Sequence, residues 1–177
     1  MTGKILAIVL GVLTLVAGAS MYYLQVYAFY DDVEPAALDL TLVPEGGGAA
    51  VAIPAGGIEA IDADSSPIRF RACFDTTLSP GEAAERFAPY EDAVPLNAPF
   101  WFRCFDAEAI GAALDAGTAR AFLSEKNIGY GVDRIVAVTD TGRGYAWHQL
   151  NDCGDLAYDG TPTGEACPPR DAFPEDP

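Results

Sequence analysis

The feature that most constrains this chain is an uninterrupted apolar run near its N-terminus. No charged side chain occurs over residues 5–24. About 20 apolar residues, each rising about 1.5 Å in an α-helix, are enough to cross the hydrocarbon core of a bilayer. We therefore predict that residues 1–30 form a short cytoplasmic N-terminus followed by one transmembrane helix.

The small and polar residues of this helix are predicted to share one face. At about 100° per residue, one narrow stripe collects five of them. They are Ala7, Gly11, Thr14, Gly18 and Gln25. Small side chains let two helix backbones approach closely, and Thr or Gln can hydrogen-bond across the contact. We interpret the stripe as a packing face toward a larger integral membrane protein complex, although glycine and alanine are common in any transmembrane helix.

Aromatic side chains at the end of the apolar run predict where it meets the lipid headgroups. They are Tyr22, Tyr23, Tyr27, Phe29 and Tyr30. Aromatic rings concentrate at membrane–water interfaces, so this set is interpreted as an interfacial belt. The alternative is a cleaved signal peptide, because Ala17, Gly18 and Ala19 before Ser20 have the form of a signal-peptidase site. A cleaved leader has no use for such a belt, so an uncleaved anchor is favoured.

Charge is distributed unevenly on the two sides of the apolar run. Lys4 is the only charged side chain before Asp31, all 26 acidic residues follow it, and the net charge is −16. The positive-inside rule places the N-terminus in the cytoplasm and the domain in the periplasm of a bacterial inner membrane. Membrane lipid is then contacted through the helix. Such acidity argues against nucleic acid as a partner and favours a basic protein such as a cytochrome c, unless the charge only aids solubility.

Four cysteines in the exported part predict two structural disulfides. They are Cys73, Cys104, Cys153 and Cys167. Their number is even, and no C-x-x-C pair suggests a metal site. Spacing does not fix the connectivity. We favour Cys73 with Cys104, because the similar segments 70–75 and 102–106 are predicted to pair as neighbouring strands, and Cys153 with Cys167, which would close a loop worth roughly 3 kcal/mol.

The rest of the chain alternates short strands with short helices. Ser79 and Glu82 form a capping-box pattern that begins a helix ending near residue 87, and Asp106 can cap a helix over residues 107–116. A third short helix is predicted to begin at Thr118. Further strands are predicted over residues 38–43, 49–53, 58–63, 128–132, 134–138 and 145–150, with a hairpin turn at 140–144.

Together these patterns predict an α+β protein: one N-terminal transmembrane helix plus a small disulfide-bonded α+β domain with antiparallel hairpins. Its predicted parts are the N-terminus and helix at 1–30, a juxtamembrane connector at 31–37, a periplasmic domain at 38–168 and a frayed C-terminal tail at 169–177.

No residue pattern in the sequence points to an enzyme or to a bound cofactor. His148 is the only histidine, and no G-x-S-x-G turn supplies a nucleophile for it. Asp152, Asp155 and Asp159 do not match the 12-residue calcium loop with its terminal Glu, so no metal site is predicted, although weak cation binding there stays open. The haem-attachment pattern C-x-x-C-H is missing from the sequence as well.

Several segments resemble an uncharacterised family of small single-span membrane proteins from alphaproteobacteria. They are TGKILAIVLGVLTLVAGASMYYLQVYAFYDDV, FWFRCFDAEAIGAAL, GVDRIVAV and GYAWHQLNDCG. The resemblance covers most of the chain and implies an inner-membrane location with a periplasmic domain. It implies no activity and no functional residue.

The sequence therefore favours a non-catalytic accessory or assembly subunit of a larger inner-membrane complex. A respiratory cytochrome complex is the first choice, because an acidic periplasmic surface suits a basic cytochrome c. The alternative is a membrane-tethered periplasmic ligand-binding or sensing module, with a small ligand near Trp101, Trp147 and His148.

Overall fold

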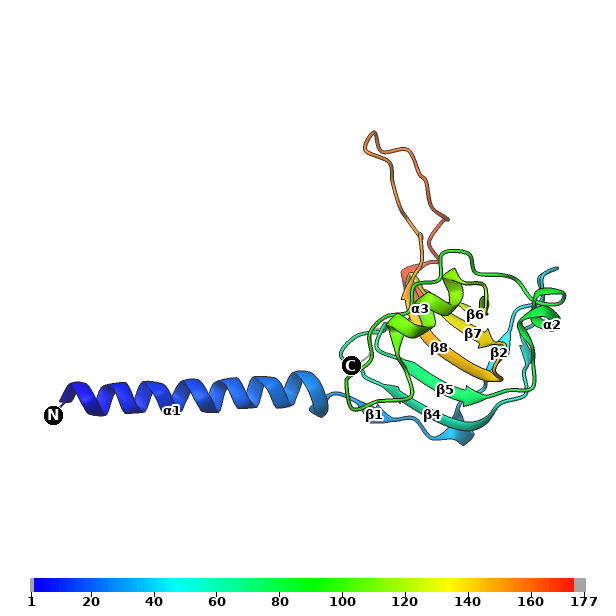
Figure 1. Ribbon diagram of the computed structural model, residues 1–177. Helices are drawn as coiled ribbons and strands as arrows, with labels where there is room; N and C mark the ends of the chain where they lie inside the picture. Colours follow the sequence, from blue (N-terminus) through cyan, green and yellow to red (C-terminus); the bar gives the residue numbers. More distant parts are fainter. Residues whose placement is uncertain (1, 174–177) are drawn as a thin grey trace.

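A long N-terminal helix and a sheet domain make up the molecule, as a computed structural model of residues 2–173 shows (Figure 1). Helix α1 (Thr2–Tyr23) continues into a π-helical turn, η1 (Leu24–Ala28). The 26 residues Gly3–Ala28 are long and apolar enough to cross a membrane, and none of the most apolar stretch is buried against the rest of the chain. An N-terminal signal sequence also meets these criteria of length and composition.

The domain is built on a six-stranded antiparallel sheet with the strand order β1-β4-β5-β8-β7-β6. A two-stranded sheet, β2 with β3, lies beside it. The strands are β1 (Asp31–Asp32), β2 (Thr41–Leu42), β3 (Val51–Ala52), β4 (Gly56–Asp62), β5 (Arg71–Asp75), β6 (Ala119–Gly129), β7 (Val132–Thr139) and β8 (Arg143–Leu150). The helices of the domain are α2 (Pro80–Ala84), α3 (Ala107–Asp115) and the short 3-10 turns η2 (Pro35–Ala37) and η3 (Arg170–Ala172).

Both faces of the large sheet are covered, so the domain has three layers and two hydrophobic cores. One core collects Phe74, Val136 and Leu42 beneath α2 and the segment that carries β2. The other collects Trp147, Ile135 and the side chains of α3 and the loop before it, and Figure 1 shows α3 lying across this face. Burial on both faces explains why residues 135–138 of β7 are continuously apolar rather than alternating.

The structure confirms the α+β class, the two disulfides and several local predictions. Ser79 and Glu82 form the predicted capping box, in which each side chain bonds the other residue's backbone N–H. The Asp106 side chain caps α3 by accepting from the Ala109 N–H at 3.0 Å. The hairpin turn between β7 and β8 lies where predicted, and both favoured cysteine pairs are bonded.

The prediction that residues 102–106 pair as a strand with residues 70–75 is wrong. β8, from much later in the chain, occupies that place, with Tyr145 opposite Cys73. Residues 102–106 instead lie over the sheet as a turn, because Phe102 and Phe105 bury their rings in the core on that face. Cys104 therefore reaches Cys73 from above the sheet rather than within it.

Two further predictions are wrong in the last half of the chain. The helix expected from Thr118 is strand β6, because Gly117, at φ +73°, ends α3 and the following residues pair with β7. The strand expected over residues 128–132 is interrupted: residues 128 and 129 end β6, residues 130 and 131 form the turn, where Gly131 has φ +70°, and Val132 begins β7.

The C-terminal tail predicted to be frayed is partly packed. The guanidinium of Arg170 lies over the Tyr130 ring, with its carbon 4.2 Å from the centroid. The ring of Phe173 meets Tyr130 edge-on. Residues 174–177 of the predicted tail, and residue 1 of the predicted cytoplasmic N-terminus, lie outside the described part of the chain.

Candidate functional site

The end of the long helix is fixed to the domain by an aromatic junction. The indole Nε1 of Trp101, in the loop before α3, donates to the carbonyl oxygen of Val26 at 2.9 Å. The Tyr27 ring stacks on Trp101 with an interplanar angle of 15°. The Tyr30 ring meets the same indole edge-on, and the Arg69 guanidinium covers Tyr30, with its carbon 5.3 Å from the centroid. The direction of the helix is therefore coupled to the domain by side-chain packing as well as by the connector.

The predicted interfacial belt forms part of this junction. Tyr27 contacts Tyr22 and Tyr23 within the helix, and it meets the Phe100 ring edge-on with centroids 6.0 Å apart. Phe29 is exposed. The sequence prediction missed Phe100 and Trp101 as neighbours of the belt. Two adjacent aromatic residues directly after a proline in a loop were the signal that could have identified them.

The predicted packing face of the helix is open in the isolated chain. A Cβ atom added at Gly11 or at Gly18 would meet no atom within 4 Å. The Thr14 hydroxyl donates to the Leu10 carbonyl at 2.9 Å, so its hydrogen is used within the helix and only its oxygen can accept from a neighbour. The Gln25 side chain contacts Met21, with its amide nitrogen 3.9 Å from the sulfur. Ala7 lies on the same exposed stretch.

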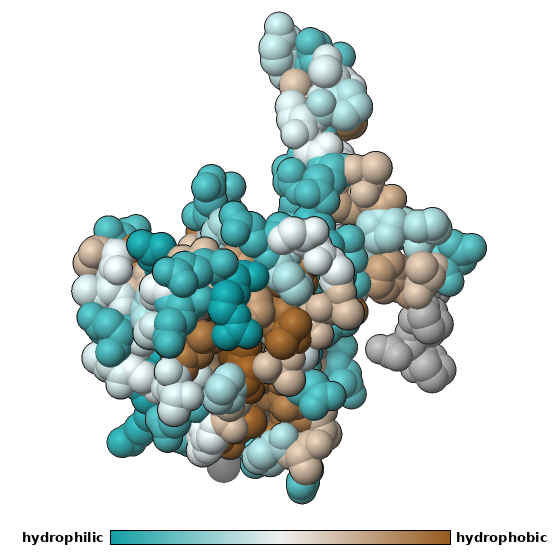
Figure 2. All heavy atoms as spheres, turned by 90° about the vertical axis from the view of Figure 1, so that its right-hand side faces the viewer, coloured by the Kyte–Doolittle hydropathy of each residue, from teal (hydrophilic) through white to brown (hydrophobic). Residues whose placement is uncertain are grey.

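A long arm leaves the domain after β8 and returns to it. This stapled arm, residues 152–167, is closed at its base by the Cys153–Cys167 disulfide. Backbone hydrogen bonds cross it near the base, from Gly154 to Glu165, and near the tip, from Ala157 to Thr161. Figures 1 and 2 both show it standing clear of the domain.

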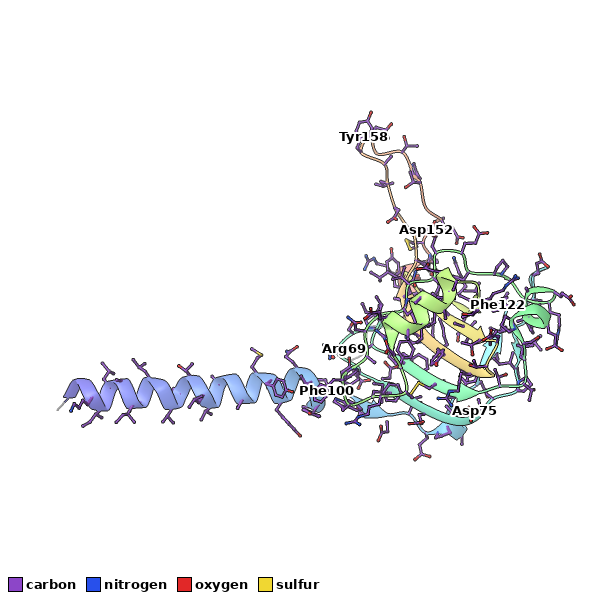
Figure 3. The ribbon with its side chains drawn as sticks, viewed as in Figure 1. Arg69, Asp75, Phe100, Phe122, Asp152 and Tyr158 are labelled. Carbon is purple, nitrogen blue, oxygen red and sulfur yellow. A yellow bond between two sulfur atoms is a disulfide. The ribbon has the colours of Figure 1, made fainter. Side chains whose placement is uncertain are left out.

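The tip of the stapled arm exposes apolar surface among acidic residues. Tyr158, labelled in Figure 3, is fully exposed and Leu156 is 62% exposed. The acidic residues of the arm are Asp152, Asp155, Asp159 and Glu165. The Asp159 carboxylate accepts from the Thr161 backbone N–H at 3.0 Å, which lowers the pKa of Asp159. Over residues 2–173, no three Asp, Glu, His or Cys side chains converge as a metal site would require.

A buried carboxylate, Asp133 of β7, lies near the base of the arm. It is completely buried, and its oxygens accept from the Asn127 backbone N–H at 2.8 Å and the Asn151 amide at 2.7 Å. The Lys126 ammonium lies 3.4 Å away. Burial first, and then the charge of Asp133, raise the pKa of the Tyr90 hydroxyl to about 12. The sequence prediction missed this cluster, because an isolated Asp in an apolar strand gives no pattern to identify.

A cleft of about 500 Å³ opens beside this cluster, between the loop after α2 and the base of the arm. Its lining is mainly polar and contains five acidic residues and one lysine. The residues that line it include Tyr90, Glu91, Asp92, Lys126, Asn151, Asp152, Asp155 and Glu165. Such a lining suits a small polar or cationic ligand and opposes an anion.

His148 has a structural environment rather than a catalytic one. Its Nδ1 lies 2.8 Å from the Pro67 carbonyl oxygen, and its Nε2 accepts from the Arg134 Nε at 3.1 Å. The ring is therefore neutral with its proton on Nδ1. Burial, and then the positive charge of Arg134, lower the pKa of His148 to about 4. Stacking on Phe70 completes its surroundings.

The ligand site expected near Trp101, Trp147 and His148 is not assembled. Trp147 is fully buried in the core beneath α3. His148 follows it in β8 and so faces the opposite side of the sheet. Trp101 is held at the helix junction, and no described cavity includes both His148 and either indole.

Residues 40–168 match a family model described as "Family of unknown function (DUF6446)". The chain belongs to this family. The DUF6446 region contains both disulfides, Asp133 and the stapled arm, whereas α1 lies outside it. No curated protein and no solved structure matches the chain. The family therefore agrees with the expected uncharacterised relatives and supplies no activity, so functional inference depends on the surfaces described above.

Proposed function

We propose that this chain is a non-catalytic, single-span accessory or assembly subunit of a larger complex in an alphaproteobacterial inner membrane. Helix α1 is its membrane span, the N-terminus is cytoplasmic, and the domain lies in the periplasm. The observation that carries the proposal is the stapled arm. It is closed by a disulfide, held by backbone hydrogen bonds, and exposes Leu156 and Tyr158 to solvent.

The construction of the arm favours a role in protein contact. The Tyr158 ring is fully exposed and most of the Leu156 side chain is exposed, although apolar surface gains nothing from contact with water. The disulfide at the base of the arm and the backbone hydrogen bonds along it restrict its conformations before any partner binds. Less conformational entropy is then lost on binding, which favours a binding role for the arm. Tyrosine is among the residues that contribute most to protein interfaces.

The direction of the arm favours a partner in the same membrane. In Figure 1 the arm extends across the direction of α1 rather than along it. If α1 crosses the bilayer, the arm runs beside the membrane surface and can reach the outer part of a neighbouring membrane protein. The two disulfides support an oxidising compartment such as the periplasm.

The charge of the arm defines the chemistry of this neighbour. Asp159 lies at the exposed tip, and Asp152, Asp155 and Glu165 lie toward the base of the arm. The partner surface is therefore an apolar pocket bordered by Lys or Arg side chains. A respiratory cytochrome complex is the finer proposal, because the acidic domain would also raise the local concentration of a basic cytochrome c.

Photo-crosslinking in native membranes tests the proposal. A photoreactive phenylalanine analogue replaces Tyr158 in the tagged full-length chain, and the same analogue at Val51, which is exposed on β3, is the control. We expect position 158 alone to crosslink to an integral membrane protein. Substituting Asp155 and Asp159 by Lys should abolish the crosslink if the charges guide docking. A chain that yields only crosslinks to itself, or none at either position, would sink the proposal.

A second candidate function is supported by the cleft beside Asp133. In that case the domain is a membrane-tethered module that binds a small cationic ligand among Asp92, Asp152 and Glu165. Thermal unfolding of the full chain with a series of polyamines tests this. Ligand binding should raise the melting temperature of the wild type but not of the Asp92→Asn variant, and no shift with any polyamine would count against it.

A further inference from the structure

We infer that the loop of residues 97–103 makes a second membrane contact, in which the Phe100 ring enters the lipid interface beside the end of α1. The domain then sits directly on the membrane instead of being held above it. This inference depends on the proposed membrane span of α1, but it is independent of any protein partner.

Phe100 is exposed in a way that the domain does not explain. Its side chain is 66% exposed, and its aromatic neighbour is Tyr27 at the end of the helix. The two residues that follow it in the loop turn inward, because Trp101 bonds to the helix and Phe102 is buried in the domain. Phe100 is therefore presented outward on a loop that is fixed directly after it.

The level of Phe100 relative to the helix is set by its neighbours. The hydrogen bond from Trp101 to Val26 and the stack of Trp101 on Tyr27 hold the loop beside the last turn of the helix. Figure 3 shows Phe100 at the edge of the domain nearest to α1. Phe100 thus continues the aromatic belt of Tyr22, Tyr23 and Tyr27, and a ring at that level lies among the headgroups.

Charges around the loop are compatible with a neutral lipid surface. Arg69 covers Tyr30 at the junction and is partly buried. Arg103 is exposed two residues beyond Trp101, so it can approach lipid phosphates. Asp31 and Asp32 follow the belt directly and would oppose an anionic surface. Because Phe100 continues the aromatic belt of the helix, we expect its ring to contact lipid rather than a groove in another protein. Phosphatidylcholine vesicles are therefore the appropriate probe.

Fluorescence quenching by brominated lipid tests the contact. The full-length chain is reconstituted in phosphatidylcholine vesicles whose acyl chains carry bromine either near the headgroup or near the bilayer centre. Three variants each add one tryptophan to Trp101 and Trp147. Phe100→Trp reports on the loop, Leu13→Trp on the span, and Tyr158→Trp on the arm as an exposed aromatic control away from the belt.

We expect the added Phe100→Trp emission to fall by about twofold with bromine near the headgroup and by less with central bromine, as for a ring in the interface. The tryptophan added by Leu13→Trp should show the reverse preference, and the one added by Tyr158→Trp should add no quenching beyond that of native Trp101. Quenching of the tryptophan at position 13 without quenching of the one at position 100 would overturn the loop contact and leave the span intact. No quenching of either added tryptophan would overturn the span and the proposed function together. Quenching of the tryptophan at position 158 beyond that of Trp101 would place the arm on lipid and contradict its docking role.

A second measurement uses the native Trp101 as reporter. Phe100→Asp should remove most of the headgroup-level quenching of Trp101, whereas Phe100→Leu should retain it, because leucine is still apolar. Trp147 is fully buried and provides an internal check that each variant is folded. Equal quenching of Trp101 in the Phe100→Asp and Phe100→Leu variants would show that the Phe100 ring does not hold the loop in the lipid interface. That result would overturn the inference.

Discussion

The two disulfides of this chain hold together regions that are built in opposite ways. Cys73 is completely buried in β5, and its bond to Cys104 ties a loop onto a core that already contains Trp147 and Phe105. Cys153 and Cys167 close an arm whose side chains bury almost nothing. The same covalent bond therefore supplements a hydrophobic core in one region and replaces it in the other.

This difference predicts how each region responds to change. In the domain, most residues are packed in the shared cores and unfold together. A destabilising substitution there should therefore lower the free energy of unfolding of the whole domain. In the arm, only the disulfide and a few backbone hydrogen bonds maintain the shape, so a defect should remain local. The domain serves as a rigid base, and the arm can vary without affecting it.

Removing the Cys73–Cys104 bond should have the largest effect. The bond closes a sequence separation of 31 residues, which corresponds to about 4 kcal/mol in the chain-entropy relation. Replacing both cysteines by alanine should lower the free energy of unfolding of the domain by about that amount, measured by urea unfolding of the full-length chain in detergent. An unchanged urea midpoint would mean that the packing of Phe102 and Phe105 alone holds the loop.

Replacing the buried Asp133 by alanine should have the next largest effect. The substitution leaves the Asn127 N–H, the Asn151 amide and the Lys126 ammonium without their shared acceptor. The expected loss is about 3 kcal/mol in the same urea experiment, because buried donors without partners are costly. Asp155→Ala in the arm is the matched control and should change the free energy of unfolding by less than about 0.5 kcal/mol. Similar losses for both variants would remove the distinction between the two regions.

Local signals in the sequence predicted much of the domain. The Ser79 capping box, the Asp106 cap and the glycine turn between β7 and β8 each depend on a few adjacent residues, and each was confirmed. The apolar run predicted α1 for the same reason. Features of this kind need no knowledge of what lies elsewhere in the chain.

The wrong predictions concern residues whose structure is decided by distant partners. The segment 102–106 has the composition of a strand, but β8 takes the place beside β5 and leaves it as a turn over the core. The segment after Thr118 was predicted as a helix, but pairing with β7 makes it strand β6. Phe100 and Asp133 could not be identified as site residues for the same reason. Phe100 is recognised by its contact with Tyr27, and Asp133 by its hydrogen bond from Asn151, and both partners are distant in the sequence.

Acidification should weaken the domain through its single histidine. The folded-state pKa of His148 is about 4, below its ordinary value of about 6.5, so the unfolded chain takes up the proton first. The stabilisation is complete above the unfolded pKa and is lost as the pH falls toward the folded one. Between pH ~7.5 and ~5 the loss from His148 should be about 2 kcal/mol. His148→Gln should flatten this part of the pH profile of urea unfolding.

If the free energy of unfolding of His148→Gln fell with pH as steeply as that of the wild type, groups other than His148 would cause the pH dependence. Asp62 is the group to separate, because burial raises its pKa. A raised carboxyl pKa acts in the opposite sense, since the folded state then takes up the proton first and gains stability as the pH falls. The Asp62 contribution therefore opposes that of His148 and cannot imitate it. An Asp62→Asn variant should accordingly show a steeper loss toward acidic pH than the wild type.

Removing the arm disulfide should have the smallest effect on the domain and a large effect on the arm. The Cys153–Cys167 bond spans a sequence separation of 14 residues and corresponds to roughly 3 kcal/mol of loop entropy. That entropy stabilises the arm, whose exposed tip makes no contact with the cores, so replacing both cysteines by serine should shift the urea midpoint of the domain very little. Limited proteolysis after Tyr158 should instead become much faster, because the arm can then open without unfolding the domain. The urea midpoint could instead fall as far as it does without the Cys73–Cys104 bond. That result would show that the arm unfolds together with the domain, and it would contradict the view that the arm is stabilised independently.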